Sequence, residues 1–255
     1  MYKIVKITFA ETDGAHADAE ALKQKAENLL NALVNSGQIM EEFLLLWQKD
    51  VLSAMVTIPC EDALDDCYAS EYVRQNAEGL SIRCEVIGDD AMSTSPCFCR
   101  NSSWYLLDMG SDNISSPLYC GDCGEDIPLC QIPYLDQSGD HHRMISWQRV
   151  HQAVIQLWME SLSDRFSRRQ IEDPASQLNR LEKKFASDLE EKLGKPVFLY
   201  LENSLMNFTR KKPLQTNCPI CGKPLQRKNF ADGAFGEMGA CEDCRICMSM
   251  PEIKH

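Results

Sequence analysis

Two pairs of cysteines near the C-terminus constrain this chain more than any other feature of its sequence. Each pair has two residues between its cysteines, and nineteen residues separate the two pairs. This spacing lets the thiolates of a pair face one ion, and tetrahedral Zn²⁺ prefers four such soft ligands. The glycine that follows the first pair permits the tight turn of a metal-binding loop. The sequence therefore predicts a zinc ribbon whose ligands are Cys218, Cys221, Cys241 and Cys244.

Several alternatives stay open for this quartet. Free thiols or a redox dithiol could replace a metal, although a redox dithiol would not need the second pair. Iron could replace zinc, because four thiolates also suit iron. Cys244 could pair with either Cys241 or Cys247, and we favour Cys241 because Cys247 then becomes a small buried side chain. Four cysteine ligands leave no open position for water, so we expect a structural zinc ion.

A second group of cysteines lies in the middle of the chain, as a CxC pair and a CxxC pair with twenty residues between them. The CxxC pair again ends in a glycine. Ligand count and spacing predict a second zinc site, with the ligands Cys97, Cys99, Cys120 and Cys123. Buried thiols beside a loop are the alternative, with Cys130, His141 and His142 as substitute ligands. We expect both histidines to face solvent, because Asp140 and Arg143 flank them.

The remaining titratable residues give no sign of catalysis. Cys60, Cys67 and Cys84 fall in predicted strands or helices, where cysteine acts as a small apolar side chain in the core. The sequence contains no Gly-rich phosphate loop, no GxSxG and no HExxH, and its five histidines have no evident carboxylate or nucleophile partner in sequence. We therefore expect that the protein is not an enzyme.

The first 90 residues follow the order β-α-β-β-α-β. Alternating apolar and polar residues mark the strands, and apolar residues at helical spacing mark the helices. The expected strands cover residues 3–9, 43–47, 51–58 and 82–87, and the expected helices cover residues 17–33 and 64–77. This order predicts a ferredoxin-like α+β sandwich. Another small α/β layer is the alternative.

Composition changes along the chain and divides it into segments. Residues 91–145 are rich in Ser, Gly, Asp and Cys and contain a single clear strand over residues 103–107. They hold too few apolar residues for a core, so this segment needs a cross-link such as a bound metal ion. The next stretch is helical, with helix starts at Ser146 and at Asp173–Pro174 and a strand over residues 197–201. The predicted domains are residues 1–90, the ferredoxin-like domain; 91–145, a cysteine-rich zinc-binding segment; 146–204, a helical region; and 205–255, the zinc ribbon.

Charge is unevenly spread over the net −12 of the chain. Residues 1–90 carry seven basic and seventeen acidic side chains, which would repel a phosphate backbone. Residues 205–230 carry six basic side chains and no acidic one, with Phe208 and Phe230 as candidate stacking faces. We expect contacts with RNA or DNA from Arg210, Lys211, Lys212, Lys223, Arg227 and Lys228. The alternative is a structural or interaction protein whose acidic N-terminal domain docks a basic protein partner, with zinc purely structural.

The sequence favours a cytoplasmic protein. It contains no run of about 18 apolar residues that could span a membrane. Its N-terminus lacks the long apolar stretch and small-residue cleavage site of a signal peptide. An odd count of 13 cysteines fits poorly with complete disulfide pairing and agrees with a reducing compartment.

Several stretches from about residue 97 onward together resemble a known family. They are residues 116–123, 127–133, 145–148, 218–222 and 241–245. The chain resembles an uncharacterised bacterial family of zinc-ribbon-containing proteins that are candidates for nucleic-acid binding. The resemblance implies a C-terminal ribbon that uses Cys241 and Cys244, because Cys247 falls outside the family pattern. It covers none of the first 90 residues.

Overall fold

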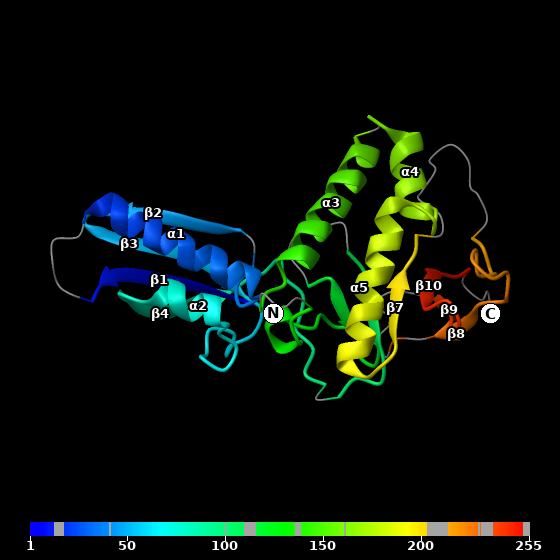
Figure 1. The fold of residues 1–255 in the computed structure, drawn as a ribbon, viewed down its shortest axis with the longest axis horizontal. Helices are drawn as coiled ribbons and strands as arrows, with labels where there is room; N and C mark the ends of the chain where they lie inside the picture. The colour runs from blue at the N-terminus through cyan, green and yellow to red at the C-terminus, as the bar shows by residue number, and fades with distance from the viewer. Residues whose placement is uncertain are drawn as a thin grey trace. The chain divides into compact units, whose positions relative to one another are not determined.

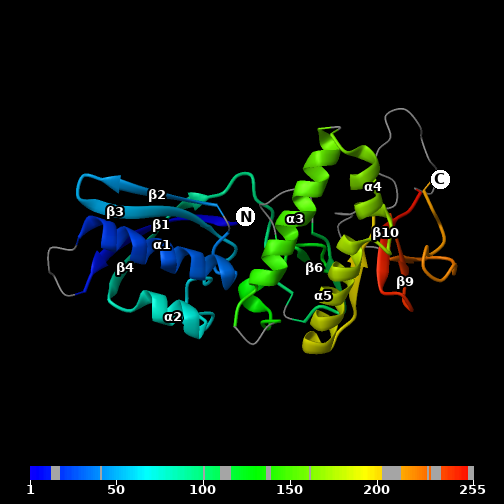
Figure 2. The ribbon, with the colours of Figure 1, turned by 45° about the horizontal axis from the view of Figure 1, so that its top comes forward.

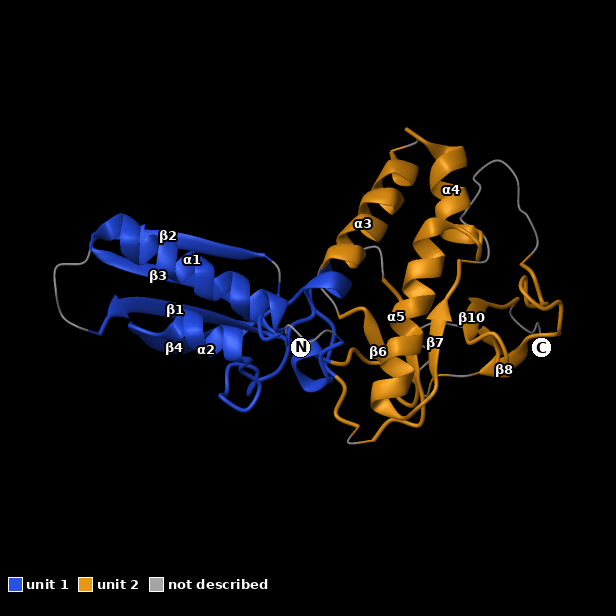
Figure 3. Ribbon diagram, viewed as in Figure 1, with its two compact units in different colours: residues 1–96, 128–145 blue, residues 97–127, 146–255 orange. Residues whose placement is uncertain are grey.

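The computed structural model divides the chain into two compact units (Figure 3). The first comprises residues 1–96 and 128–145, and the second comprises residues 97–127 and 146–255. The predicted segment 91–145 is therefore shared between the units, and the expected helical region and ribbon fall in one unit. The structure describes residues 1–12, 18–40, 42–99, 101–109, 116–135, 139–160, 162–202, 214–228, 230 and 237–251.

The first unit contains a four-stranded antiparallel sheet with helices on one face (Figures 1 and 2). Its main elements are β1 (Lys3–Glu11), α1 (Ala19–Asn35), β2 (Phe43–Gln48), β3 (Val51–Ile58), α2 (Glu71–Ala77) and β4 (Leu80–Asp89). The strands lie in the order β2-β3-β1-β4. The element order is the one predicted from the sequence, and with the second unit it makes the protein a mixed α+β structure.

Alternation along β1 and helical periodicity along α1 produce the core of this unit. The Asp18 carboxylate accepts a hydrogen bond from the Glu20 amide at 3.2 Å and caps α1. The buried side chains that meet between sheet and helix include Val5, Ile7 and Phe9 from β1, and Ala26, Leu29, Leu30 and Leu33 from α1. Each fully buried leucine stabilises the fold by about 1.5–3 kcal/mol.

Helix α2 is shorter than expected. The sequence predicted a helix over residues 64–77, but α2 begins at Glu71, where the Ser70 hydroxyl accepts a hydrogen bond from the Val73 amide at 3.2 Å. The preceding residues form successive turns, in which the Asp65 amide donates to the Asp62 carbonyl. Aspartate and serine favour turns and caps over helix interiors, and this preference outweighs the apolar periodicity.

Gly37 follows α1 at a position that only glycine fits. Its φ of +74° is left-handed, and an added Cβ would lie 2.4 Å from the Leu129 Cβ and 2.9 Å from the backbone nitrogen of Cys130. Both neighbours belong to the 3-10 turn η1 (Leu129–Gln131) of the same unit. We expect Gly37→Ala to lower the unfolding free energy by about 2 kcal/mol more than a glycine replacement that meets only backbone strain.

Gly79→Ala is the matched control for this prediction. Gly79 has the same φ of +74° in the same unit, but nothing lies within 4 Å of its added Cβ. Its replacement should lower the unfolding free energy by about 1–2 kcal/mol, from left-handed strain alone. Urea unfolding of both variants measures the difference. Equal losses would show that the turn η1 moves aside without penalty.

The second unit is organised by a six-stranded sheet in the order β6-β5-β7-β10-β9-β8. Its strands are β5 (Tyr105–Leu107), β6 (Leu118–Cys120), β7 (Val197–Tyr200), β8 (Gln226–Lys228), β9 (Met238–Cys241) and β10 (Ile246–Ser249). Strand β7 is parallel to both β5 and β10. One sheet therefore joins strands from the expected cysteine-rich segment, helical region and ribbon.

The helices of this part of the chain begin at different residues from those predicted. They are α3 (His142–Met159), α4 (Asp164–Glu172) and α5 (Gln177–Leu193). Helix α3 begins before Ser146, because the Asp140 carboxylate accepts a hydrogen bond from the His142 amide at 3.0 Å. Helix α5 is capped by Ser176 rather than Asp173, whose carboxylate accepts from Ala175 in the preceding turn. Within the described residues, no helix has the length and apolar character needed to cross a membrane.

Candidate metal centres

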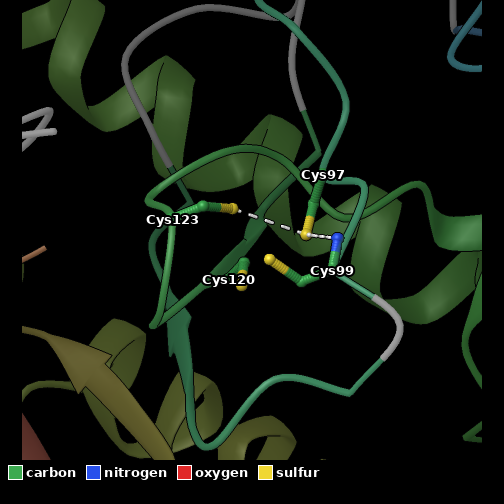
Figure 4. A group of neighbouring side chains, drawn as sticks. All are labelled: Cys97, Cys99, Cys120 and Cys123. Carbon is green, nitrogen blue, oxygen red and sulfur yellow. Dashed lines mark hydrogen bonds between the residues drawn. The ribbon is translucent and has the colours of Figure 1, made fainter. Parts of the chain in front are cut away.

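The second unit brings eight of its nine cysteines together into two groups of four. In each group the four sulfur atoms all lie within 4.8 Å of one another. Figure 4 shows the central group, in which the sulfurs face a common space. The groups contain the residues proposed from spacing, namely Cys97, Cys99, Cys120 and Cys123 in the centre and Cys218, Cys221, Cys241 and Cys244 in the ribbon.

Both CxxC-Gly sequences fold into the same hydrogen-bonded loop. In the central loop, the Gly124 amide donates to the Cys120 carbonyl at 2.8 Å, and the Cys120 amide donates to the Glu125 carbonyl at 2.9 Å. In the ribbon, the equivalent bonds join Gly222 to Cys218 at 2.9 Å and Cys218 to Lys223 at 2.8 Å. The glycines have φ values of +80° and +74°. The glycine after each pair is therefore required by a left-handed turn, as the sequence suggested.

The third CxxC pair, Cys241 and Cys244, adopts a related loop in which no glycine follows the second cysteine. Arg245 occupies the left-handed position with φ +52°, and Cys241 and Ile246 pair across the hairpin of β9 and β10. The Arg245 side chain donates to the Glu242 carbonyl at 2.9 Å and pairs with Glu190 at 3.0 Å. These contacts hold an arginine in a conformation that glycine usually adopts. A search for CxxC-Gly alone would miss this loop.

Polar groups around the central thiols favour the charged form of one ligand. Burial alone would raise the pKa of Cys120, but hydrogen bonds from the Ser102 hydroxyl at 2.9 Å and from nearby backbone amides lower it. Burial raises the pKa of Cys97, and raises that of Cys123 to about 11. A divalent cation would stabilise the ionised form of four thiols packed in this way, because a bound metal ion deprotonates its cysteine ligands outright.

The ribbon group has one exposed thiol, Cys221, and three buried ones. A hydrogen bond from the Lys223 backbone lowers the pKa of Cys221 to about 7, whereas burial raises the pKa of Cys244 to about 12. Cys218, Cys241 and Cys244 pack in the apolar cluster of Leu225, Ile246 and Met248. The ribbon group therefore has one solvent-facing thiol and three thiols that belong to the small core of the ribbon.

The sulfur distances fit a tetrahedral ion. With zinc–sulfur bonds of about 2.3 Å, tetrahedral geometry separates the sulfurs by about 3.8 Å. The sulfurs of Cys97 and Cys123 lie 3.5 Å apart, and those of Cys221 and Cys241 lie 3.6 Å apart. Both groups could therefore hold a metal ion with small adjustments. Four thiolates suit zinc and also iron, so geometry leaves the identity of the ion open.

Cys247 and Cys130 lie outside both groups. Cys247 is fully buried in a cluster with Phe198, Phe230 and Ala240, and burial raises its pKa to about 12. Cys130 packs in the core of the first unit. His141 is buried in the first unit, so the expectation that it faces solvent was wrong, whereas His142 is exposed.

Two of the cysteines expected in the core are exposed. Cys67 and Cys84 lie at the surface, and Cys60 is half-buried against the core of the first unit. Cys67 belongs to the turns that replace the start of the predicted helix. Cys84 lies on β4, an outer strand of the sheet. The prediction failed because an edge position and a turn both leave side chains uncovered.

The predicted nucleic-acid contacts fall into two sets. Arg210, Lys211 and Lys212, together with Phe208, lie outside the described residues. The other three basic residues form ion pairs: Lys223 with Asp243, Arg227 with Glu237, and Lys228 with Glu242 at 3.0 Å.

The aromatic environment of the ribbon also differs from expectation. Phe230 is only 4% exposed and packs against Trp104, so it offers no stacking face in this structure. The Lys228 ammonium lies 4.6 Å from the Trp104 ring centroid and 4.5 Å from that of Phe198. Such cation–π contacts hold Lys228 against the unit, so it is only partly available to a phosphate.

A buried histidine–carboxylate pair lies between α3 and α5. His151 is 7% exposed and Glu182 is 2% exposed. The His151 Nδ1 and Glu182 Oε1 atoms lie 3.9 Å apart, which is too far for a hydrogen bond, and neither has a hydrogen-bond partner among the described residues. The two residues are far apart in sequence, so the search for a neighbouring carboxylate missed them. Their place on the apolar faces of two helices was the available signal.

Burial moves these two groups toward their neutral forms. It lowers the pKa of His151 to about 4. It also raises the pKa of Glu182 well above its ordinary value, with a smaller contribution from Asp108. Below pH 6.5 the unfolded chain protonates His151 and the folded chain does not, so this contribution to stability is lost as pH falls. Glu182 keeps its proton longer when folded, so its contribution is lost as pH rises.

We therefore expect His151→Gln and Glu182→Gln to change the pH dependence of stability in opposite directions. With only Glu182 titrating, the unfolding free energy should decrease as pH rises toward neutrality. With only His151 titrating, it should increase over the same range, by about 1.4 kcal/mol per pH unit between about pH 4.5 and 6.5. Urea unfolding at several pH values, compared with the native chain, measures both slopes. Identical slopes for the two variants would contradict the assignment.

Comparisons with known proteins assign domains but no activity. Residues 1–87 match the family model of a domain of unknown function (DUF8589), and residues 99–202 match that of another domain of unknown function (DUF2310). The central CxxC loop lies inside the second match, and the C-terminal quartet lies outside both. Neither family model therefore covers the ribbon.

Two uncharacterised proteins of Haemophilus influenzae are similar to this chain. They are 26% and 25% identical to it over 171 residues, which is 65% of this chain in each case. The matched region covers 62% of the first relative and 80% of the second. No solved structure matches the chain. These findings agree with an uncharacterised bacterial family and do not confirm that it is a zinc-ribbon family.

Proposed function

We propose that this protein is a non-enzymatic zinc protein in which two Zn²⁺ ions, each held by four cysteines, stabilise a scaffold for macromolecular binding. The convergence of eight thiols on two centres, with the same backbone loop at Cys120 and Cys218, carries the proposal. Four thiolates per ion leave no position for substrate or water, so both metals are structural. Reduced thiolates of this kind belong in the cytoplasm.

The ferredoxin-like sandwich is our proposed assignment for the first unit. The strand order β2-β3-β1-β4, the antiparallel neighbours and the helices on one face support it. This unit carries an exposed acidic stretch that includes Glu61, Asp62, Asp65 and Asp66. A surface of this charge suits a basic protein partner and repels nucleic acid.

Contact with RNA or DNA through the ribbon is the competing proposal. The absence of acidic residues from positions 205–230 in the sequence favours it. The ion pairs of Lys223, Arg227 and Lys228 weaken it, because each of these charges already has an acidic partner. We therefore favour the scaffold that binds protein, with nucleic-acid contact as the alternative that the experiment must decide.

Metal analysis of the purified native chain tests the zinc assignment. Two zinc ions per chain are expected, and a chain without metal that still unfolds cooperatively would overturn it. Fluorescence anisotropy with single-stranded RNA and DNA at increasing salt tests the choice of partner. Little binding at low salt supports the protein-binding scaffold. Binding that weakens steeply with salt, and is lost in Lys223→Gln/Arg227→Gln/Lys228→Gln but kept in Lys183→Gln/Lys184→Gln/Lys192→Gln, supports nucleic acid.

A further inference from the structure

Strand β4 is an exposed edge of the sheet in the first unit. It pairs with β1 and has no second neighbour among the described strands. Nine of its ten residues are exposed, and only Leu80 is buried. Such an edge presents unpaired backbone N–H and C=O groups over a length well above that of an ordinary strand. Another strand could therefore pair with β4.

One face of β4 carries an uncovered apolar row. Ile82, Cys84 and Val86 lie opposite Phe9, Ile7 and Val5 of β1, respectively, on the face that the helices cover elsewhere. Ile82 is 40% exposed and Val86 is 62% exposed. The helices therefore leave the β4 end of this apolar face open to solvent.

The other face of β4 carries one charge of each sign. Arg83 and Glu85 lie on either side of Cys84, and both are exposed. Neither forms an ion pair among the described residues, whose salt bridges in this unit involve other side chains. A strand that pairs with β4 would meet a positive and a negative group two positions apart.

We propose that β4 pairs with β4 of a second copy of this chain in an antiparallel dimer whose two-fold axis passes at Cys84. In this register Ile82 lies opposite Val86 of the other copy, and Cys84 lies opposite Cys84. Arg83 lies opposite Glu85, and the symmetry forms this ion pair twice. The apolar row meets an apolar row, and the two sheets become continuous.

Charge selects this register over its neighbours. In two antiparallel strands related by a two-fold axis, residues directly opposite each other lie on the same face of the sheet. The axis must therefore pass at a residue, and the possible registers differ in which residue that is. An axis at Arg83 places two arginines opposite each other, and an axis at Glu85 does the same for two glutamates. An axis at Ile82 or at Val86 leaves Glu85 without an opposing arginine. Only the axis at Cys84 pairs both charges, so the strand is complementary to itself.

The experiment measures the dimer dissociation constant of the full chain by sedimentation velocity, with reductant present to prevent a disulfide at Cys84. Arg83→Glu and Glu85→Arg each place like charges opposite one another twice, so each should weaken the dimer by about tenfold or more. The double variant Arg83→Glu/Glu85→Arg restores opposite charges and should recover the dimer. A mixture of the two single variants should also recover it, because every pair in the mixed dimer is then attractive.

The controls separate loss of the dimer from loss of the fold. Circular dichroism should be unchanged in the single variants, because the side chains are exposed. Val86→Lys, which places a charge in the apolar row, should also give a monomer. A native chain that is monomeric at all concentrations would overturn the proposal. So would a dimer that all three single variants leave intact, because it would use another surface. The outcome does not depend on the proposed zinc scaffold, which metal analysis of the same samples tests separately.

Discussion

Replacing Cys120 with serine is expected to reduce the zinc content of the chain from two ions to one and to destabilise the second unit. Cys120 ends β6, is fully buried, and has the Ser102 hydroxyl 2.9 Å from its sulfur. Two backbone hydrogen bonds fix the conformation of the loop that carries this sulfur. Serine preserves the loop but is a poor zinc ligand, because its hydroxyl does not ionise as a thiol does.

The size of this effect follows from the place of the metal in the unit. A lost ligand should lower zinc affinity by more than the 10–100-fold typical of an altered neighbour of a ligand, which corresponds to about 3 kcal/mol of unfolding free energy or more. The loss spreads beyond the site because Cys120 belongs to β6, which pairs with β5 and has no second neighbouring strand among the described residues to hold it in the six-stranded sheet. Metal analysis and urea unfolding, with and without a chelator, measure both changes.

Cys67→Ser is the matched control. Cys67 is exposed, lies in the first unit and belongs to neither sulfur group. Its replacement should leave two zinc ions and an unchanged response to chelator. If Cys120→Ser also retained two ions, the central group would not be a metal site. It would then be a set of packed thiols, the alternative that the sequence left open.

Local patterns predicted the elements of the first unit better than their ends. Apolar alternation and helical spacing indicated every strand and helix of the β-α-β-β-α-β order, because apolar residues recur along each element at the period of its secondary structure. The second helix begins later than the sequence predicted, because Ser70 and the aspartates before it favour caps and turns. Exposure of Cys84 could not be predicted, because it depends on which strand lies at the edge of the sheet.

The organisation of the second unit depends on pairings that no local pattern contains. Strand β6 spans only three residues, and β7 lies between β5 and β10 through parallel pairing over long sequence separations. These contacts merge segments that differ in composition. The cysteines of the two sulfur groups, by contrast, could be predicted from spacing, because a CxxC pair carries its own loop geometry. The partners of Lys228 could not, since its contacts come from Glu242, Trp104 and Phe198.

Replacing Cys244 with serine is expected to empty the ribbon of its zinc, whereas replacing Cys247 with alanine should leave it filled. In the sequence Cys241 and Cys247 compete as the partner of Cys244, but the sulfur group contains Cys241 and Cys244 and not Cys247. Cys247 is fully buried among Phe198, Ala240 and other side chains of the neighbouring cluster. Alanine should be tolerated there at a loss of about 1 kcal/mol, from one removed sulfur atom in a packed core.

The effect of Cys244→Ser should be large because the ribbon has little core of its own. Its buried cluster consists of a few side chains together with three of the ligands themselves. A structural zinc ion in such a small module contributes about 10–16 kcal/mol of apparent binding free energy, so its loss should unfold the hairpin of β9 and β10. Hydrogen exchange of the β9 and β10 amides reads out this local unfolding, and metal analysis counts the ions.

Cobalt substitution gives the comparison a second readout. Tetrahedral Co²⁺ bound by four thiolates absorbs visible light, and the absorption should be halved in Cys244→Ser and unchanged in Cys247→Ala. A halved absorption in Cys247→Ala would assign Cys247 as a ligand in place of Cys241 and would require the chain after Cys241 to shift register against β9. Such a shift would break the pairing of Cys247 with Ala240 and of Ile246 with Cys241. A result that made Cys247 a ligand would therefore also contradict the strand register of the ribbon.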